Sequence, residues 1–142
     1  MISTFASLSA TDLYRFLRLR CEVFIVEQRS LYPELDGRDM EPSTLHVWVD
    51  APDGSVAAYL RVLSEPDGSA RIGRVVTAAP SRGQGLAGRL MAAALERIGP
   101  ERPVVLDAQT VATGLYARFG FVVTGPAYDD EGIEHVPMAR RP

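Results

Sequence analysis

Arginine and three glycines gather in one turn, the run Arg82-Gly83-Gln84-Gly85-Leu86-Ala87-Gly88. Glycine has no Cβ, so the backbone of such a turn can come close to a ligand. If a helix begins at Leu86, its first N–H groups have no partner inside the helix, and the helix dipole adds partial positive charge there. The turn is therefore predicted to bind an anionic group such as a phosphate. The alternative is that these small residues only allow the helix to pack tightly on a strand.

The kind of phosphate ligand is a separate question. Gly83, Gly85 and Gly88 match the dinucleotide pattern G-x-G-x-x-G, and Asp107 follows near the end of the next apolar run. In that pattern the first glycine follows its strand closely, whereas residues 77–82 intervene here. The loop G-x-x-x-x-G-K-[ST] is absent. An oxidoreductase that binds NAD or a flavin therefore stays a minor alternative.

The turn needs a strand before it and a helix after it, and the apolar pattern supplies both. Residues 71–77 read as a strand, and the Ala-, Leu- and Met-rich residues 86–98 read as a helix that ends at Gly99-Pro100. Periodicity predicts further helices at 10–26 and 111–119, strands at 2–6, 45–50, 55–63, 103–108, 121–124 and 134–139, and loops at 27–44 and 126–132. Strands that are first antiparallel and then crossed by one helix predict an α+β fold with a mixed, mostly antiparallel sheet.

Length and composition limit the functions. A chain of 142 residues has the common size of one domain, so residues 1–142 are predicted to form a single domain. The net charge of −3 gives no footprint for nucleic acid, and no apolar run approaches the roughly 20 residues that span a bilayer. The N-terminus has no signal-peptide pattern. A lone cysteine, Cys21, and two histidines leave no disulfide and no zinc spacing, so we expect a cytoplasmic protein without a metal.

The glycine turn after its strand resembles the acyl-CoA loop of the GNAT superfamily of N-acetyltransferases. The resemblance implies a GNAT-like acyl-CoA N-acyltransferase fold, a three-layer sandwich, with acetyl-CoA as co-substrate. It implies that Val75, Val76 and Thr77 contact the pantetheine and acetyl end, and that Arg82, Gly83, Gln84, Gly85, Leu86, Ala87 and Gly88 line the diphosphate. Many members carry Gln or Arg where this chain has Pro80, which removes one side-chain contact but leaves the backbone cradle.

A second motif supports the same family. Leu115-Tyr116-Ala-Arg-Phe-Gly120-Phe121 resembles the family's L-Y-x-x-x-G-F segment, whose tyrosine lies near the CoA sulfur. Tyr116 is therefore the candidate donor to the leaving thiolate, with simple packing of the helix as the alternative. Many members place Asn seven residues before that tyrosine, where this chain has Gln109. A shifted contact of Gln109 with the pantetheine is the expectation.

The N-terminal part is similar to the ElaA-type branch of the superfamily. The similar segments are Arg20–Gln28, Tyr32–Asp39 and Tyr128–Met138, which makes the resemblance nearly full length. This branch implies no firm acceptor. The pattern R-x-x-V-F with the later Glu34, Asp36 and Asp39 also resembles acyl-homoserine-lactone synthases, whose chains are longer.

Acetyl transfer to an amine would need a base. An amine with a pKa of about 10.4 is almost entirely protonated at pH 7, and its deprotonation costs roughly 4.6 kcal/mol of free energy. Glu27 and His46 are the acceptor-side candidates, on segments that would flank the cleft together with Asp36 and Asp39. Backbone N–H groups near Val75 and Val76 could hold the oxyanion. Asp107 could be a base, but a turn position is favoured.

These inferences favour an acyltransferase that moves an acetyl group from acetyl-CoA to a primary amine. A non-catalytic CoA-binding or interaction module on the same fold is the main alternative. The expected partner is a small-molecule amine or a peptide, with no nucleic acid and no membrane. The sequence leaves open the acceptor, the length of the acyl group and whether the chain forms a homodimer.

Overall fold

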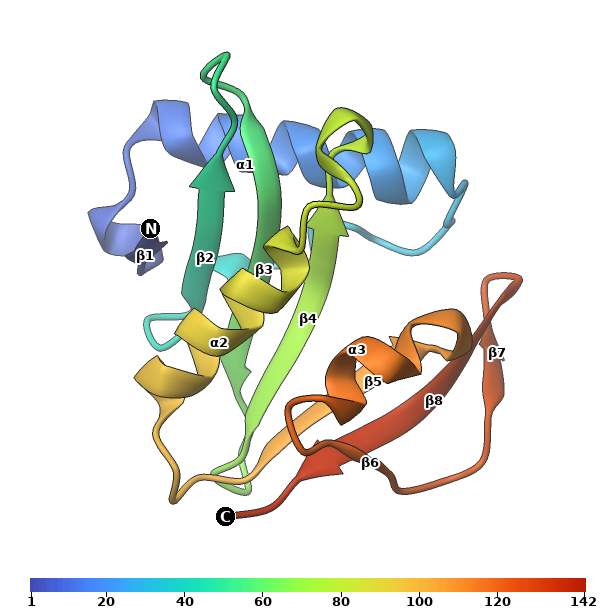
Figure 1. The fold of residues 1–142 in the computed structure, drawn as a ribbon. Helices are drawn as coiled ribbons and strands as arrows, with labels where there is room; N and C mark the ends of the chain where they lie inside the picture. Colours follow the sequence, from blue (N-terminus) through green and yellow to red (C-terminus); the bar gives the residue numbers. More distant parts are fainter.

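The computed structural model describes residues 1–142 and has one mixed sheet (Figure 1). Seven strands follow the order β1-β2-β3-β4-β5-β8-β6, and β7 pairs with β8 outside that path. All pairs are antiparallel except β4 with β5. The strands are β1 (Ile2–Ser3), β2 (Leu45–Asp50), β3 (Val56–Ser64), β4 (Ala70–Thr77), β5 (Val104–Gln109), β6 (Val122–Val123), β7 (Tyr128–Asp130) and β8 (Ile133–Arg140).

Helices cover both faces of the sheet. The helices are α1 (Ala10–Arg20), α2 (Leu86–Ile98) and α3 (Thr113–Ala117), with a π-helical segment at Cys21–Glu27 that continues α1. Side chains of a strand alternate between the two faces, so Val47 joins the core under α2 whereas its neighbour Trp48 joins the core under α1. Phe16 of α1 is fully buried among the aromatic side chains of that second core. The expected sandwich of helices around a mixed sheet is confirmed.

The sheet opens between β4 and β5. Their parallel ladder pairs only Ala70 with Val104 and Arg71 with Val105, although β4 runs on to Thr77. Figure 1 shows the two strands diverging beyond this point. Both strands therefore have an unpaired edge that faces the gap.

The main differences from the sequence-based expectations lie at the ends of elements. The strand expected at 2–6 stops at Ser3, and a 3₁₀ turn follows at Phe5–Ser7. The helix expected at 10–26 changes to π-helical geometry at Cys21–Glu27. The loop expected at 126–132 contains β7, because its residues pair with β8 in a hairpin that has no apolar alternation to reveal it.

The helices are too short or too polar for a bilayer. None of them combines the length and the apolar character that crossing a membrane demands.

Candidate active site

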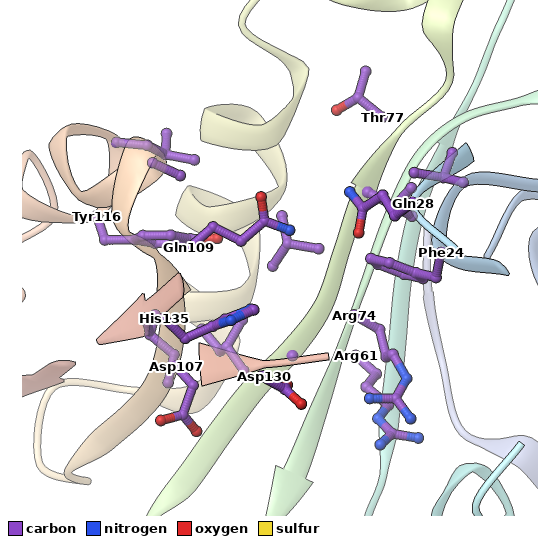
Figure 2. A pocket seen from close by; sticks show the side chains of 18 of the residues that line it. Phe24, Gln28, Arg61, Arg74, Thr77, Asp107, Gln109, Tyr116, Asp130 and His135 are labelled. Atoms are coloured by element: carbon purple, nitrogen blue, oxygen red, sulfur yellow. The ribbon is translucent and has the colours of Figure 1, made fainter. Parts of the chain in front are cut away.

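A cleft of about 820 Å³ occupies the gap between β4 and β5. Figure 2 shows its two walls. Gln109, Tyr116 and His135 come from the β5–α3–β8 side, and Phe24 and Gln28 face them from the segment after α1. The cleft is therefore lined by both apolar and polar side chains, and each wall contributes polar groups.

A bulge in β4 turns the backbone at the centre of the cleft. Tyr59 of β3 pairs with Val76, but Arg61 pairs with Gly73, so β4 holds an extra residue between these two pairs. Arg74 in this bulge has φ of 54°, an uncommon conformation for a residue with a side chain. Bulges beside clefts re-aim backbone groups. The predicted pantetheine contacts all line the cleft, Val75 within this bulge and Val76 and Thr77 directly after it.

The cleft continues into a second cavity of about 320 Å³ at the start of α2. We call the segment Arg82–Gly88 the cradle. The cavity is lined by Arg82, Gly83, Gly85, Leu86, Ala87 and Gly88 of the cradle, and Gln84 lines neither cavity. On the other side, Leu115 and Phe119 close it. The structure thus brings together six of the seven residues that the sequence assigned to the diphosphate.

The cradle leaves backbone donors without partners. The first bond of α2 runs from the Arg89 N–H to the Gly85 carbonyl, so the amides of Leu86, Ala87 and Gly88 have no backbone acceptor. No side chain caps this helix. Gly83 and Gly85 have φ of 80° and 74°, a region that glycine adopts without strain. The cradle therefore fits a diphosphate by its chemistry, since several amides and the positive helix end converge on one cavity.

Tyr116, the expected proton donor, lies on the wall of the cleft. It comes from α3, lines the cleft and is only 7% exposed. Burial raises the pKa of its phenol to about 12. The side chain packs edge-on against Phe121, with ring centroids 6.3 Å apart. Tyr116 therefore remains a protonated donor across the physiological range. Gln109 lines the same side of the cleft at the end of β5.

Of the two acceptor-side candidates, only Glu27 reaches the cleft. Glu27 ends the π-helical segment, lines the cleft and accepts a hydrogen bond from Arg82 Nη2 at 3.0 Å. His46 is fully buried under α1 and does not line the cleft. Its Nε2 lies 3.0 Å from the Asp39 carbonyl, and its Nδ1 lies 2.7 Å from the Tyr59 hydroxyl.

These contacts define the state of His46. A carbonyl can only accept, so Nε2 carries the proton and Nδ1 accepts from the hydroxyl. Burial also lowers the pKa of His46, which keeps the imidazole neutral. Both ring nitrogens are therefore used within the fold.

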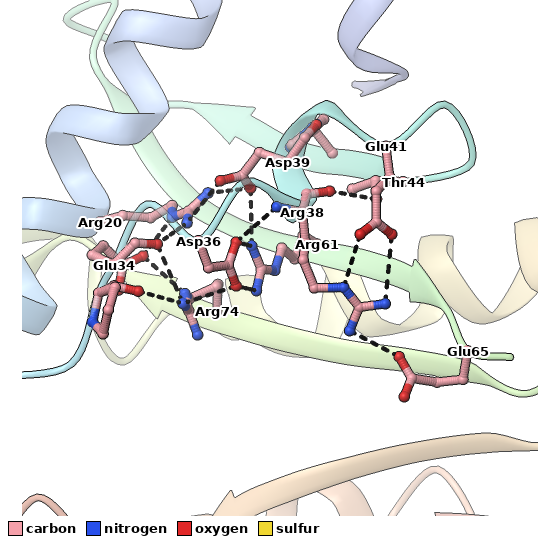
Figure 3. A network of polar contacts seen from close by, with 12 residues as sticks. Arg20, Glu34, Asp36, Arg38, Asp39, Glu41, Thr44, Arg61, Glu65 and Arg74 are labelled. Carbon is pink, nitrogen blue, oxygen red and sulfur yellow. Dashed lines mark hydrogen bonds and ion pairs between the residues drawn. The ribbon is translucent and has the colours of Figure 1, made fainter.

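An ion-pair network lies beside the cleft (Figure 3). It consists of three arginines and three carboxylates: Arg20, Arg61, Arg74, Glu34, Asp36 and Asp39. Arg20 is fully buried and contacts Glu34 and Asp39 at 2.7 Å each. The charges cancel within the network. Asp36 and Asp39, which the sequence placed beside the acceptor, are therefore held by arginines.

Asp36 illustrates the electrostatics of this network. Partial burial would raise its pKa, but bonds from Arg61 and from the Arg38 backbone N–H outweigh burial and lower the pKa. For Asp39, too, burial is outweighed by Arg20 and Arg61, and the pKa is lowered. Both carboxylates are therefore ionised at neutral pH and suited to holding arginine rather than to taking up a proton.

Several cleft residues were not assigned from the sequence. They are Gln28, Tyr32, Arg61, Arg71, Arg74, Tyr128, Asp130 and His135. Asp107 was expected in a turn but lies within β5, where it pairs with Arg71 at 2.8 Å. His135 stands opposite Gln109 in the β5–β8 register and so reaches the cleft from the neighbouring strand. His135 lies in the strand expected at 134–139, but no sequence pattern indicated that this strand would pair with β5.

The open mixed sheet, the cleft between its parallel strands and the cradle define a class, the acyl-CoA N-acyltransferase fold. Solved structures agree with this assignment. An acyl-CoA N-acyltransferase from Pseudomonas aeruginosa matches with a TM-score of 0.90 and 41% identity, covering 99% of this chain and 97% of that chain. Escherichia coli ElaA matches with a TM-score of 0.92 and 34% identity over the same shares of the two chains.

Within this class the chain belongs to the GNAT acetyltransferase family, whose domain matches residues 17–142. A UPF0039 protein of Mycobacterium tuberculosis is 48% identical over 136 residues, which covers 94% of this chain and 86% of that protein. In sequence, Escherichia coli ElaA is 36% identical over 140 residues, 95% of this chain and 91% of ElaA. The resemblance to the ElaA-type branch is thereby confirmed.

Proposed function

We propose that this protein transfers an acetyl group from acetyl-CoA to a primary amine. The observation that carries the proposal is the continuous path from the unpaired amides of the cradle, along the open edge of β4, to the buried phenol of Tyr116. The acyl thioester supplies the activated carbonyl. The chain supplies the binding path and the proton donor.

The cradle and β4 would bind the carrier. Arg82 and the amides of Gly83 to Gly88 bind the diphosphate, since oriented N–H groups at a helix start suit an anion. The unpaired edge of β4 at Val75, Val76 and Thr77 pairs with the amide groups of the pantetheine arm, as an added strand would. Gln109 faces the arm from β5.

Three groups of the chain would carry the chemistry. Tyr116 donates its proton to the departing thiolate sulfur. Backbone N–H groups at Val75 and Val76, beside the bulge, stabilise the oxyanion that develops on the carbonyl. Glu27, the one acceptor-side candidate in the cleft, accepts the proton of the attacking amine directly or through water. We assign His46 a structural role, since both of its nitrogens are bonded within the fold.

The substitution Tyr116→Phe tests the catalytic part of this proposal. It removes the hydroxyl and retains the ring that packs on Phe121. We expect kcat to fall about 100-fold, the usual loss when a general acid is removed, with little change in CoA affinity. Thiol release would be measured with acetyl-CoA and a broad panel of amines. Release in the variant at the wild-type rate would remove Tyr116 from the mechanism.

Thermal melts test the choice of carrier. CoA at 100 times its dissociation constant should stabilise the protein by about 2.7 kcal/mol, a shift of several degrees for a chain of this size. NAD⁺ should give no shift. A response to NAD⁺ alone would favour an oxidoreductase. A shift with CoA but no thiol release with any amine would favour the non-catalytic CoA-binding module.

The acceptor proposed is a small-molecule amine or a peptide amine, and the location proposed is the cytoplasm.

Three carboxylates resemble those of acyl-homoserine-lactone synthases, and all of them are paired with arginines: Glu34, Asp36 and Asp39. Their placement gives no separate support for a lactone synthase. Amine transfer is therefore the function that the cleft supports best.

A further inference from the structure

Arg82 lies where the cleft meets the cradle, and it lines both cavities. Its Nε donates to the Thr77 carbonyl at 3.1 Å. Its Nη2 donates to Glu27 Oε1 at 3.0 Å. The side chains of Arg82 and Glu27 are 44% and 47% exposed, so neither is locked by packing. The residue that should meet the diphosphate is therefore held by a carboxylate of the acceptor side.

Glu27 has one ion-pair partner, and that partner is Arg82. Glu27 lines the cleft together with its chain neighbour Gln28. While the pair is closed, the guanidinium neutralises Glu27. In this state Glu27 itself offers little attraction to an ammonium group.

A diphosphate bound in the cradle would compete for the same guanidinium. Phosphate oxygens accept charge-assisted hydrogen bonds from arginine, often two at once. The pair with Glu27 is half-exposed, and such ion pairs contribute little free energy. The diphosphate should therefore displace Glu27 as the partner of Arg82.

We propose that Arg82 exchanges partners when CoA binds, leaving Glu27 for the diphosphate, and that the freed Glu27 carboxylate then receives the ammonium group of the acceptor. This inference rests on the proposed function. It assigns the acceptor to the cationic primary amines. It also couples the two sites. If CoA binding increases the affinity for the ammonium group, binding of the amine must increase the affinity for CoA by the same factor.

The test is a double-mutant cycle on CoA binding, measured by titration calorimetry at low ionic strength. The proteins are the wild type, Glu27→Gln, Arg82→Gln and the double variant. Glu27→Gln removes the competitor for Arg82 and should lower the dissociation constant of CoA about two- to fivefold, the range expected for a half-exposed ion pair. Arg82→Gln should raise the dissociation constant of CoA. In the Arg82→Gln background, the additional substitution Glu27→Gln should leave that constant unchanged.

Glu22→Gln is the matched control. Glu22 belongs to the same π-helical segment and pairs with Arg18 at 3.0 Å, but it does not line the cleft. The control removes the same charge and should leave CoA affinity unchanged. Pantetheine, which lacks the diphosphate, should bind Glu27→Gln and the wild type equally.

Two results would overturn the exchange of partners. One is unchanged or weaker CoA binding in Glu27→Gln, and the other is tighter binding that persists when Arg82 is already Gln. If the wild type does not bind CoA at all, the proposed function fails instead. The assignment of the acceptor has its own readout: for any amine turned over, Glu27→Gln should raise KM and Glu22→Gln should not, and an unchanged KM contradicts it.

Discussion

The cradle and the ion-pair network are both polar regions beside one cleft. They differ in whether their polar groups have hydrogen-bond partners within the protein. In the network, three arginines and three carboxylates are bonded to one another, and of its buried side-chain atoms only Glu34 Oε1 and Arg61 Nε lack a partner. In the cradle, successive backbone amides have no backbone acceptor. Buried polar groups are rarely left unpaired, whereas the first amides of a helix are free to bond water or a ligand. The comparison indicates that the network supports the fold, whereas the cradle has backbone donors free for the anion proposed above.

The two regions also differ in which feature of the sequence they require. The network depends on the identity of each side chain, since removal of one charge leaves an opposite charge buried. The cradle depends on backbone conformation, which glycine permits at Gly83 and Gly85. The predictions below separate stability from ligand binding on this basis.

The largest expected effect is on stability, from Arg20→Met. The substitution leaves Glu34 and Asp39 without a fully buried partner, and we expect a loss of about 3–5 kcal/mol in the free energy of unfolding. Urea denaturation would measure it. Arg18→Met on the same helix, where the side chain is exposed, is the control and should change stability by less than about 0.5 kcal/mol. A loss below about 1 kcal/mol in Arg20→Met would show that the network is not structural.

A smaller loss of stability with a large loss of binding is expected from Gly85→Val. Gly85 has φ of 74°, which strains a β-branched residue by about 1–3 kcal/mol. The strain also turns the helix-start amides away from a common point, so CoA affinity should fall at least about tenfold.

Gly68→Val is the matched control for this prediction. Gly68 has φ of 92° in the β3–β4 turn, away from the cleft and the cradle. It should lose similar stability and keep its CoA affinity. Equal effects of the two variants on CoA binding would remove the cradle from the account.

The smallest expected effect is a response of stability to acid. The folded protein lowers the pKa of Asp36, so the unfolded state takes up protons first as the pH falls. The stabilisation from Asp36 is complete above about pH 5, is lost progressively as the pH falls through the ordinary pKa of about 3.9, and continues to fall toward the lowered pKa of the folded protein. Asp36→Asn should therefore be less stable by about 1 kcal/mol at pH 7 and should show a shallower decline between pH 5 and 2. Parallel pH profiles for the two proteins would contradict this.

The sequence predicted the parts of the molecule that short-range patterns determine. The glycine turn, the helix after it and the tyrosine motif of Tyr116 indicated the family and the fold. The network could not be predicted, because Arg20 meets Glu34 and Asp39 only after α1 packs on the sheet. His46 lay on a strand with a suitable side chain, and only the structure places it on the buried face. The β7–β8 hairpin was missed for lack of an apolar pattern, and with it the cleft positions of Tyr128 and Asp130. His135 lay on an expected strand, but its pairing with β5 had no sequence signal.

The most direct test of the account follows the backbone amides of the cradle by NMR while CoA is added. Saturating CoA should shift the amide resonances of Gly83, Gly85, Leu86 and Ala87 strongly, as oriented donors take up a diphosphate. Pantetheine should shift resonances along β4 and leave those of the cradle nearly in place. Cradle resonances that stay unmoved when CoA saturates the protein would contradict the central claim.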